Sequence, residues 1–409
     1  MDAVLLAAGE GTRLRPLTVT RPKPMLPVAG KPILEWNLEA LSDAGFKKAV
    51  IIVGFKKEEI INHFGSRFKN LAVEYVVQKE QLGTGHAIAT AEKHVSGDFL
   101  AMNGDILTSK ESIASLVADW KKNKPSVALA LVEVHTPSDY GVVAASGNVI
   151  TGIEEKPKHP KSNLVNGGIY VFKKEIFTTL SGIKSSRRGE YEITDAIHAL
   201  IPLKQAYGFK LKGLWMDIGL PWHLLDANEI MLKQSKLKPS RKARIEKYAI
   251  VKGDVHIGDG TLVKAGSYIE GPVFIGKDCD IGPNCYIRPY TTILDRCHIG
   301  NAVEVKNSIL MSNTKIGHLS YIGDSIIGHH CNFGAGTTIA NLRFDNDGIM
   351  IEVKGALRNS GRRKFGCLMG DNVKTGINVS IMPGRSIYPN AVIEPMTTVK
   401  NTIYGETPQ

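Results

Sequence analysis

The chain has 409 residues, and its 51 basic against 40 acidic side chains give a formal net charge of +11. Its 43% hydrophobic and 22% charged residues exclude a disordered chain, and its length predicts two domains rather than one hydrophobic core. We expect a cytoplasmic protein without a membrane partner, because the sequence shows no signal peptide, no run of ~20 apolar residues and no C-x-x-C pair.

The first 230 residues alternate short apolar runs with segments of helical spacing. The predicted strands are residues 3–8, 49–53, 71–77, 99–102 and 127–134, and the predicted helices are residues 32–41 and 84–91. Such alternation predicts an α/β fold, a Rossmann-like sandwich with a mainly parallel sheet. Its ligands should gather at the carboxyl ends of the strands.

A glycine loop follows the first predicted strand, but it is neither G-x-G-x-x-G nor a P-loop. Together with the segments Leu6–Pro16 (LAAGEGTRLRP) and Arg21–Pro27 (RPKPMLP), it resembles the signature of sugar-1-phosphate nucleotidylyltransferases. The resemblance implies nucleotide binding by Ala8, Gly9, Gly11 and Thr12, and catalysis by Arg13 and Lys23. Backbone N–H groups of this loop can cradle a triphosphate, while two cations stabilise the charge on the transferred and leaving phosphates.

The segment Gln78–Ala87 (QKEQLGTGHA) is similar to the uridine-reading segment of the bifunctional bacterial enzymes that make UDP-N-acetylglucosamine. By that likeness Gln78, Gln81 and Gly83 face the uracil, and Thr84 lies near the nucleotide. The residues by themselves also fit a polar loop that caps the following helix. His86 is expected to start that helix rather than to act as a catalyst.

Asp105 follows a predicted strand, and Asp217 lies in the segment Trp215–Gly219 (WMDIG). The family resemblance implies that the two carboxylates converge and bind Mg²⁺, which prefers a couple of carboxylates together with phosphate oxygens. The bifunctional bacterial enzymes typically carry Asn at the second position. The WMDIG context resembles the glucose-1-phosphate branch instead, which leaves the preference for base and sugar open.

Three further segments match the parts of this family that hold the sugar. They are Tyr140–Gly141, Glu154–Pro157 and Asn166–Gly168. The resemblance implies that Gly141, Glu155 and Asn166 bind sugar hydroxyls and that Lys156 binds the sugar phosphate.

Residues 231–247 carry seven basic and one acidic side chain, a net +6 of the total +11. No aromatic residues interleave with them, so a solvated linker is favoured over a nucleic-acid surface. We therefore expect a nucleotidylyltransferase domain at residues 1–230, a basic linker at 231–244 and a second domain at 245–409.

The second domain begins with an unbroken six-residue repeat of aliphatic side chains from Ile245 to Val305, which indicates a parallel β-helix. Four residues after each aliphatic comes a small or β-branched side chain, so Cys279, Cys285 and Cys297 are expected in the core. The pattern resembles the hexapeptide acyltransferases, and that likeness implies a left-handed β-helix and a trimer. An insertion at residues 341–365 interrupts the repeat, and a loop of that length is usually functional.

The segment His318–Asp324 (HLSYIGD) departs from the small, apolar chemistry of the coils. Its spacing to flanking polar residues is similar to that of the acetyltransferase half of the same bifunctional family. The likeness implies His318 as the general base, which fits a group that titrates near neutrality. It also implies that the sugar phosphate is held by Arg288 and Lys306, the amino sugar by Tyr321, Asn332 and Asn341, and acetyl-CoA by Ala335, Gly376 and Asn378.

One position departs from the family. The usual lysine in the loop after Asn341 is replaced by Asp347, so Arg343 or Lys354 takes its role, or the acceptor sugar differs. The basic run 362–364 fits either the phosphates of CoA or a solvated loop.

The resemblance as a whole implies a bifunctional UDP-N-acetylglucosamine pyrophosphorylase and glucosamine-1-phosphate N-acetyltransferase. Its small-molecule partners would be sugar phosphates, UTP and acetyl-CoA, with Mg²⁺ as cofactor, a homotrimer as assembly and no nucleic acid. Two alternatives stay open. One is a single-activity hexose-1-phosphate nucleotidylyltransferase, using UTP or dTTP, whose β-helix only oligomerises. The other is a non-catalytic scaffold like certain translation-initiation-factor subunits, which commonly lose the cation and metal residues.

Overall fold

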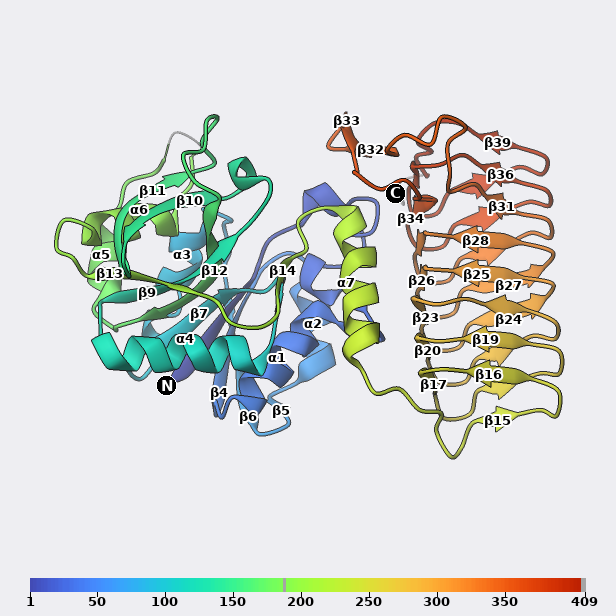
Figure 1. The fold of residues 1–409 in the computed structure, drawn as a ribbon, viewed down its shortest axis with the longest axis horizontal. Coiled ribbons are helices and arrows are strands. Elements are labelled where there is room, and N and C mark those ends of the chain that lie inside the picture. Colours follow the sequence, from blue (N-terminus) through green and yellow to red (C-terminus); the bar gives the residue numbers. More distant parts are fainter. Residues whose placement is uncertain (187–188, 406–409) are drawn as a thin grey trace. The chain divides into compact units, whose positions relative to one another are not determined.

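The computed structural model describes residues 1–186 and 189–405 (Figure 1). The chain forms two compact units. The first comprises Met1–Glu10, Pro22–Met25 and Ile33–Asp217, and the second comprises Gly11–Arg21, Leu26–Pro32 and Ile218–Gln409. The loop that carries the nucleotidylyltransferase signature thus contributes residues to both units.

The first unit is built on a mixed sheet in the order β10-β11-β13-β9-β12-β7-β1-β4-β6-β5. Its strands are β1 (Asp2–Ala7), β4 (Lys48–Val53), β5 (Arg67–Phe68), β6 (Leu71–Val77), β7 (Phe99–Asn103), β9 (Val127–Glu133), β10 (Gly141–Ser146), β11 (Val149–Glu155), β12 (Leu164–Phe172) and β13 (Ala206–Lys210). A small separate sheet joins β8 (Ile106–Thr108) to β14 (Trp215–Asp217). The helices are α1 (Ile33–Asp43), α2 (Lys57–Phe64), α3 (Thr84–Ala89), α4 (Lys110–Asn123), α5 (Ile176–Gly182) and α6 (Ile193–Leu200). This is the predicted Rossmann-like nucleotidyltransferase fold.

Apolar side chains cover both faces of the central strand β1, which explains its continuous apolar run. Ala3 and Leu5 belong to one fully buried core cluster, and Val4 belongs to the cluster on the other face. Strands β7, β1, β4 and β6 pair in parallel, as predicted. The carboxyl ends of these strands therefore meet at one edge of the sheet.

The other half of the sheet is not the parallel arrangement that the sequence suggests. Strand β12 runs antiparallel to both β7 and β9, and β10 and β11 form an antiparallel hairpin. Strands β10 and β11 are joined by a short turn between Ser146 and Val149, and only antiparallel neighbours permit such a short connection. The sheet is thus parallel from β7 to β6, ends in the antiparallel edge strand β5, and is mainly antiparallel on the other side of β7.

The second unit contains the predicted left-handed parallel β-helix, whose coils stack one on another in Figure 1. Sheet I holds β15 (Arg244–Ile245), β18 (Leu262–Val263), β21 (Asp280–Ile281), β24 (His298–Asn301), β27 (Lys315–His318), β30 (Asn332–Phe333), β35 (Lys374–Thr375) and β38 (Val392–Ile393). Sheet II holds β16 (Ile250–Lys252), β19 (Tyr268–Glu270), β22 (Tyr286–Ile287), β25 (Glu304–Lys306), β28 (Tyr321–Gly323), β31 (Thr338–Ile339), β36 (Ser380–Ile381) and β39 (Thr398–Val399). Sheet III holds β17 (Val255–Ile257), β20 (Val273–Ile275), β23 (Thr291–Ile293), β26 (Ile309–Leu310), β29 (Ile326–Ile327), β34 (Cys367–Met369) and β37 (Arg385–Ile387).

The six-residue aliphatic repeat fills the interior of the β-helix, as predicted. Cys279, Cys285 and Cys297 are at most 2% exposed and lie in the same cluster as the repeat's isoleucines. All five cysteines are free and buried. They act as small apolar spacers between the layers of larger side chains.

Glycine often follows the aliphatic residue of the six-residue repeat, and two different physical reasons account for it. Left-handed backbone occurs directly after the aliphatic residue at Gly282, with φ of 95°, and later in the corner at Gly260, Asp278 and Asn284, with φ of 74°, 53° and 51°. Gly258 instead faces the next coil, where an added Cβ would lie 2.5 Å from the backbone of Gly276. Glycine is required there because two coils approach each other too closely for a side chain.

The outer face of sheet III is buried, although the outer faces of a β-helix usually meet solvent. Four outward-facing side chains of successive strands are 0% exposed: Thr292, Ile309, Ile326 and Leu368. The residue that follows each of them faces the interior instead, as Ile293, Leu310, Ile327 and Met369. Helix α7 (Pro221–Gln234) contributes to this cover: its Asn228 accepts a hydrogen bond from Thr292 Oγ1 at 2.7 Å and donates to the Tyr290 carbonyl at 2.8 Å. The short strands β2 (Pro27–Val28) and β3 (Lys31–Pro32) belong to the same unit.

Arg21 of the signature segment forms a buried ion pair inside the second unit. Its Nη2 lies 2.5 Å from Asp371 Oδ2, and both side chains are 10% exposed. Thr20 Oγ1 donates to the same oxygen at 2.7 Å, and the His329 N–H donates to Oδ1 at 2.8 Å. Burial pushes the pKa of Asp371 upward, but Arg21 and Thr20 outweigh it and hold that pKa below its ordinary value. The carboxylate is therefore charged and fully engaged.

The ring of His329 beside this pair predicts a loss of stability in mild acid. Burial, reinforced by the charge of Arg21, lowers the pKa of His329 from 6.5 to about 4, although Asp371 opposes this. The unfolded chain takes up this proton first, so stability should fall as the pH drops from 6.5 toward 4, by up to about 3 kcal/mol. Urea unfolding of the full chain between pH 7 and 4.5 measures the effect. His329→Gln should flatten the slope, whereas the exposed control His330→Gln should keep it; an unchanged slope in His329→Gln would contradict the assignment.

In the described parts of the chain, no helix combines the length and the apolar character needed to cross a membrane.

Candidate active sites

The first candidate site lies at the carboxyl ends of the parallel strands of the first unit. The Ala8 carbonyl, just past β1, accepts hydrogen bonds from Gln81 Nε2 at 3.0 Å and from the Phe55 N–H at 3.1 Å. Two residues predicted to bind nucleotide, 73 positions apart, are thus in direct contact. Gly9 follows as an exposed residue with open space around it, so its backbone is accessible.

The segment predicted to read uridine forms one tight loop before α3. The buried amide of Gln78 donates to His86 Nδ1 at 2.9 Å and lies 3.4 Å from the Gly83 carbonyl. Thr84 Oγ1 accepts from the Ile193 N–H at 3.1 Å. Gly83 has φ of 104°, a conformation that favours glycine. Gln78 and Thr84 therefore shape the loop through bonds within the protein, while Gln81 lies against the Ala8 carbonyl.

The other signature residues are divided between the units. Gly11, Thr12 and Arg13 belong to the second unit, where a 3₁₀ turn (Thr12–Leu14) starts at Gly11 with φ of 65°. The Gly11 carbonyl accepts from Thr18 Oγ1 at 2.9 Å, which helps to hold this turn. Lys23 belongs to the first unit, is 5% exposed and forms an ion pair with Asp105.

The two predicted metal ligands lie at the same end of a two-stranded sheet. Strand β14 pairs antiparallel with β8, and Asp217 lies opposite Ile106, the residue that follows Asp105. Tyr140 donates its hydroxyl proton to Asp217 Oδ2 at 3.3 Å. In residues 1–186 and 189–405 no group of three or more potential metal-ligating side chains occurs. Two carboxylates that leave the remaining positions to phosphate and water fit Mg²⁺ rather than a metal enclosed by protein.

The predicted sugar-holding residues also come together. Gly141 pairs with Glu155, and a Cβ on Gly141 would lie 3.0 Å from Glu155 Oε2 and 3.6 Å from Asn166 Cβ. Asn166 donates to the Tyr170 hydroxyl at 2.8 Å and accepts from the Gly168 N–H at 3.0 Å. Burial raises the pKa of Tyr170, so the hydroxyl stays protonated. Lys156 Nζ lies 3.6 Å from Glu155 Oε1.

Thr194 lies beside these predicted sugar-holding residues, and the sequence analysis did not identify it. Its side chain is 5% exposed, and its methyl group lies 3.5 Å from the position of a Cβ on Gly141. Its Oγ1 is buried and has no hydrogen-bond partner among the described residues. Threonine at the start of a helix is too common a pattern to mark it.

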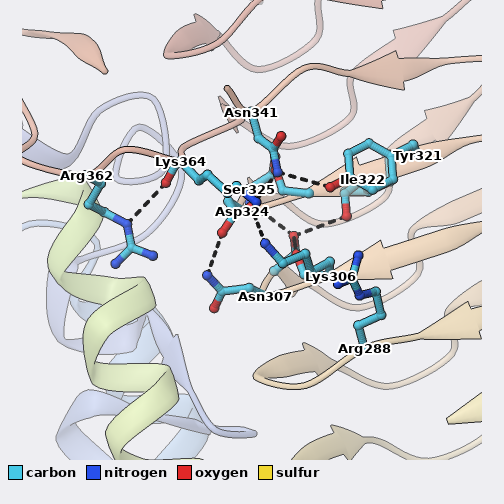
Figure 2. Close-up of polar contacts among 12 residues, drawn as sticks. Arg288, Lys306, Asn307, Tyr321, Ile322, Asp324, Ser325, Asn341, Arg362 and Lys364 are labelled. Atoms are coloured by element: carbon cyan, nitrogen blue, oxygen red, sulfur yellow. Dashed lines mark hydrogen bonds and ion pairs between the residues drawn. The ribbon is translucent and has the colours of Figure 1, made fainter. Parts of the chain in front are cut away.

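The second candidate site lies on sheet II of the β-helix, where a polar cluster surrounds Asp324 (Figure 2). Lys306 Nζ lies 3.3 Å from Asp324 Oδ2, and Asn341 Nδ2 lies 2.5 Å from the same oxygen. Asn341 Nδ2 also donates to the Tyr321 hydroxyl at 3.0 Å. Burial, together with the charge of Asp324, raises the pKa of Tyr321. Three of the residues predicted to bind the amino sugar phosphate are therefore in one network.

Arg288 lies at the edge of this cluster, one coil below Lys306. Its Nη1 forms a 2.8 Å ion pair with Glu304 Oε1, and both side chains are about one-third exposed. The hydrogen bond with Glu304 raises the pKa of Arg288 further above its already high value. The sequence analysis assigned no role to Glu304 or Asp324. These carboxylates pair with Arg288 and Lys306, the two cations predicted to bind the sugar phosphate. Asp324 was visible within the motif, but nothing in the pattern indicated that its side chain is buried and joins Lys306 to Asn341.

The predicted base and the acetyl-CoA residues follow one corner of successive coils. His318 ends β27 and is exposed, and its carbonyl accepts from the Gly336 N–H at 3.2 Å. One coil further, the Ala335 carbonyl accepts from the Asn378 N–H at 2.8 Å. Asn332 is exposed in β30, in register with Lys315 and Lys374. A Cβ on Gly376 would lie 2.5 Å from the backbone nitrogen of Pro395 in the next coil, so no side chain fits at this position.

The insertion forms a hairpin of β32 (Met350–Val353) and β33 (Ala356–Asn359). Arg343, one candidate for the missing lysine, forms an exposed ion pair with Asp345, whose pKa it strongly lowers. Lys354, the other candidate, lies at the hairpin turn with φ of 53°.

The basic run at residues 362–364 is also engaged within the unit. Arg362 pairs with Asp226 of α7, and its Nε lies 3.4 Å from the Lys364 carbonyl (Figure 2). Arg363 donates to Asn346 Oδ1 at 3.1 Å. Burial raises the pKa of Asp226 although Arg362 opposes it. These contacts favour a structural role for Arg362.

Comparisons with known proteins cover both halves of the chain. A family model described as nucleotidyl transferase matches residues 2–234, and one described as GMPPB C-terminal domain matches residues 269–404. The bifunctional protein GlmU of Methanocaldococcus jannaschii is 46% identical over 408 residues, which is 100% of this chain and 97% of that protein. The bifunctional sugar-1-phosphate nucleotidylyltransferase/acetyltransferase of Sulfurisphaera tokodaii is 42% identical over 409 residues, 99% of each chain. A crystal structure of UDP-glucose pyrophosphorylase complexed with UDP-glucose has a TM-score of 0.53 and 27% identity, covering 57% of this chain and 99% of that one.

The two bifunctional relatives match essentially the whole chain, at 46% and 42% identity, and both names describe a bifunctional protein. The family predicted from the motifs is thereby confirmed: the chain belongs to the GlmU family of bifunctional sugar-1-phosphate nucleotidylyltransferase/acetyltransferases.

Proposed function

We propose that this transferase makes UDP-N-acetylglucosamine in two steps. In the first step, acetyl-CoA acetylates the amine of glucosamine-1-phosphate. In the second, the resulting N-acetylglucosamine-1-phosphate attacks UTP and releases pyrophosphate. The observation that carries the proposal is the full-length relation to bifunctional GlmU proteins, together with the gathering of family-motif residues in both units.

For uridylyl transfer, the phosphate oxygen of the sugar attacks the α-phosphorus of UTP, and the bond to the β-phosphate breaks. Arg13 and Lys23 would stabilise the charge that grows on the transferred and leaving phosphates. Asp105 and Asp217 would hold Mg²⁺, which supplies charge neutralisation at the triphosphate when bound. Gly141, Glu155 and Asn166 would orient the sugar, and orientation alone lowers the barrier of such a bimolecular step.

For acetyl transfer, the amine nitrogen attacks the thioester carbon, the C–S bond breaks, and CoA leaves as a thiol. His318 would take the proton from the amine, and its exposed position at the end of β27 supports access to both substrates. Lys306 and Arg288 would hold the sugar phosphate. Tyr321, Asn332 and Asn341 would orient the ring, while Ala335, Gly376 and Asn378 would contact acetyl-CoA.

We further propose a homotrimer formed through the β-helix. Leu319 and Met396 are large apolar side chains at coil corners, are 66% and 72% exposed, and have left-handed backbones with φ of 50° and 62°. Bulky residues in that conformation are uncommon, and exposed apolar side chains of this kind are typical of an interface.

The five buried, free cysteines favour a reducing, cytoplasmic environment.

An alternative exists for which sugar and which nucleotide base the enzyme prefers. Asp217 lies in a context typical of glucose-1-phosphate enzymes, and Arg343 is paired with Asp345 instead of standing free for the acceptor. The rival is a nucleotidylyltransferase of broader sugar range. A matrix of UTP, dTTP, ATP and GTP against glucose-1-phosphate, glucosamine-1-phosphate and N-acetylglucosamine-1-phosphate, read by pyrophosphate release, separates the two. We expect the highest kcat/KM for UTP with N-acetylglucosamine-1-phosphate; a higher value for glucose-1-phosphate with any nucleotide favours the rival.

A further inference from the structure

Asp324 is the most enclosed carboxylate of the polar cluster on sheet II, and family motifs assign it no role here. Its side chain is 3% exposed. Both carboxylate oxygens are occupied: Oδ1 by Asn307 Nδ2 at 2.7 Å, and Oδ2 by Lys306 at 3.3 Å and Asn341 at 2.5 Å. A buried charge is costly unless it is paired and hydrogen-bonded, so this arrangement calls for a reason beyond filling a coil corner.

The partners of Asp324 come from different coils of the β-helix. Lys306 ends β25, Asp324 follows β28 in the next coil, and Asn341 follows β31 in the coil after that. Figure 2 shows the lysine and the asparagine side chains pointing toward the carboxylate from these different levels. The carboxylate therefore links side chains that the backbone pairing of the coils does not itself bring into contact.

The backbone at this corner does not depend on the carboxylate. The Asp324 N–H donates to the Lys306 carbonyl at 2.9 Å, and the Asp324 carbonyl accepts from the Gly366 N–H at 2.8 Å. The φ of 50° at Asp324 is a conformation that asparagine adopts as readily as aspartate. The fold of the coil is thus separable from the charge on the side chain.

The geometry also leaves donors for a ligand. An ammonium group has three N–H donors, and the ion pair with Asp324 occupies one of them. A lysine held at one donor directs the other two, whereas a free lysine samples many rotamers. The companion pair Arg288–Glu304 is about one-third exposed on both sides, so its contribution is small.

We infer that Asp324 is the positioning residue of the acetyltransferase site: it fixes the Lys306 ammonium for the phosphate of the amino sugar and the Asn341 amide for its ring. The inference rests on the proposed function of this site. Asp324 would thus contribute to the specificity for a phosphorylated amino sugar without contacting the substrate itself. Loss of its charge should weaken sugar phosphate binding and leave acetyl-CoA binding unchanged.

The test is Asp324→Asn in the full chain, with acetylation of glucosamine-1-phosphate followed by thiol release. We expect the KM for glucosamine-1-phosphate to rise roughly 10- to 100-fold, because misplaced binding groups cost this much. The KM for acetyl-CoA and the rate of uridylyl transfer should stay within about twofold of wild type, as for independent sites. Glu304→Gln, which breaks the exposed pair, should have a much smaller effect. An unchanged KM for the sugar phosphate in Asp324→Asn would overturn the inference.

Two controls separate positioning from plain destabilisation. In a double-mutant cycle with Lys306→Met, Asp324→Asn should raise the KM by a smaller factor than it does alone, because the part of its effect that acts through the Lys306 ammonium is already lost and only the part through Asn341 remains. Additive losses would overturn the inference. Asn307→Leu removes another hydrogen bond from the same carboxylate without touching a predicted substrate group. If it lowers Tm as much as Asp324→Asn does but leaves the KM unchanged, positioning is supported; an equal rise in KM overturns it.

The failure of this inference and the failure of the proposed function give different results. If wild-type protein does not acetylate glucosamine-1-phosphate at all, the proposed function fails, and the inference fails with it. If wild type acetylates it and Asp324→Asn does so with unchanged constants, only the role of Asp324 is wrong.

Discussion

Asp105→Ala should reduce uridylyl transfer by about 10²- to 10³-fold while leaving acetyl transfer unchanged. Asp105 directly precedes Ile106, the residue that pairs with Asp217 between β8 and β14, so its removal would take away one of the two proposed metal ligands. It also leaves Lys23, which is 5% exposed, without its partner. Electrostatic groups of this kind are each worth about 3–4 kcal/mol of barrier, which corresponds to the expected loss. Pyrophosphate release at saturating UTP measures it.

The matched control is Asp43→Ala, which removes an exposed carboxylate from the end of α1 in the same unit. It should leave both activities within about twofold of wild type, as surface substitutions usually do. Asp105→Asn keeps the shape but not the charge, and it should lose nearly as much as Asp105→Ala. Uridylyl transfer that survives both Asp105 variants would contradict the assignment of the metal site.

His318→Ala should produce the complementary loss in the other activity. A general base in the right place contributes about 10²- to 10⁴-fold, so acetylation should fall by that factor. Uridylyl transfer from supplied N-acetylglucosamine-1-phosphate should not change. Thiol release from acetyl-CoA and pyrophosphate release, measured on the same preparation, report the two activities.

His330→Ala is the control for this variant, because His330 is an exposed histidine at a coil corner of the same β-helix. Equal losses in the two variants would indicate damage to the β-helix rather than loss of a base. If His318→Ala retained full acetylation, His318 would not be the base. If wild type lacked acetylation as well, the β-helix would serve only for assembly.

Much of the fold was predictable because its periodicities are local. The six-residue aliphatic repeat indicates a β-helix without any knowledge of distant contacts, and its cysteines lie in the core as expected. Apolar runs likewise located β1, β4, β6 and β7 to within a residue or two. What local patterns cannot contain is the pairing of distant strands, which is why the antiparallel half of the first sheet was missed.

The buried outer face of sheet III was also missed, although the sequence held a signal for it. Pairs such as Ile309-Leu310, Ile326-Ile327 and Leu368-Met369 put an apolar side chain on both faces of a strand. A repeat that meets solvent on its outer face would alternate apolar and polar residues. The double apolar positions indicated that another part of the chain covers this face, and α7 supplies part of that cover.

The candidate sites were predictable only as far as the motifs reach. Motifs named Asp105 and Asp217, but their convergence depends on the pairing of strands more than 100 residues apart. The motifs identified Lys306 and Asn341 as site residues. They did not identify Asp324 as the carboxylate that joins the two, because residue spacing does not show where a side chain points. Arg21 lies in the nucleotidylyltransferase signature segment, but only the structure shows that it has a buried partner in Asp371.

The most direct test of the account supplies the full chain with glucosamine-1-phosphate, acetyl-CoA, UTP and Mg²⁺ and identifies the nucleotide sugar by mass spectrometry. We expect UDP-N-acetylglucosamine, with one CoA thiol and one pyrophosphate released for each molecule formed. Omitting acetyl-CoA should abolish that product. A nucleotide sugar without the acetyl group as the main product in the complete mixture, or pyrophosphate release that is not matched by CoA release, would contradict a bifunctional enzyme.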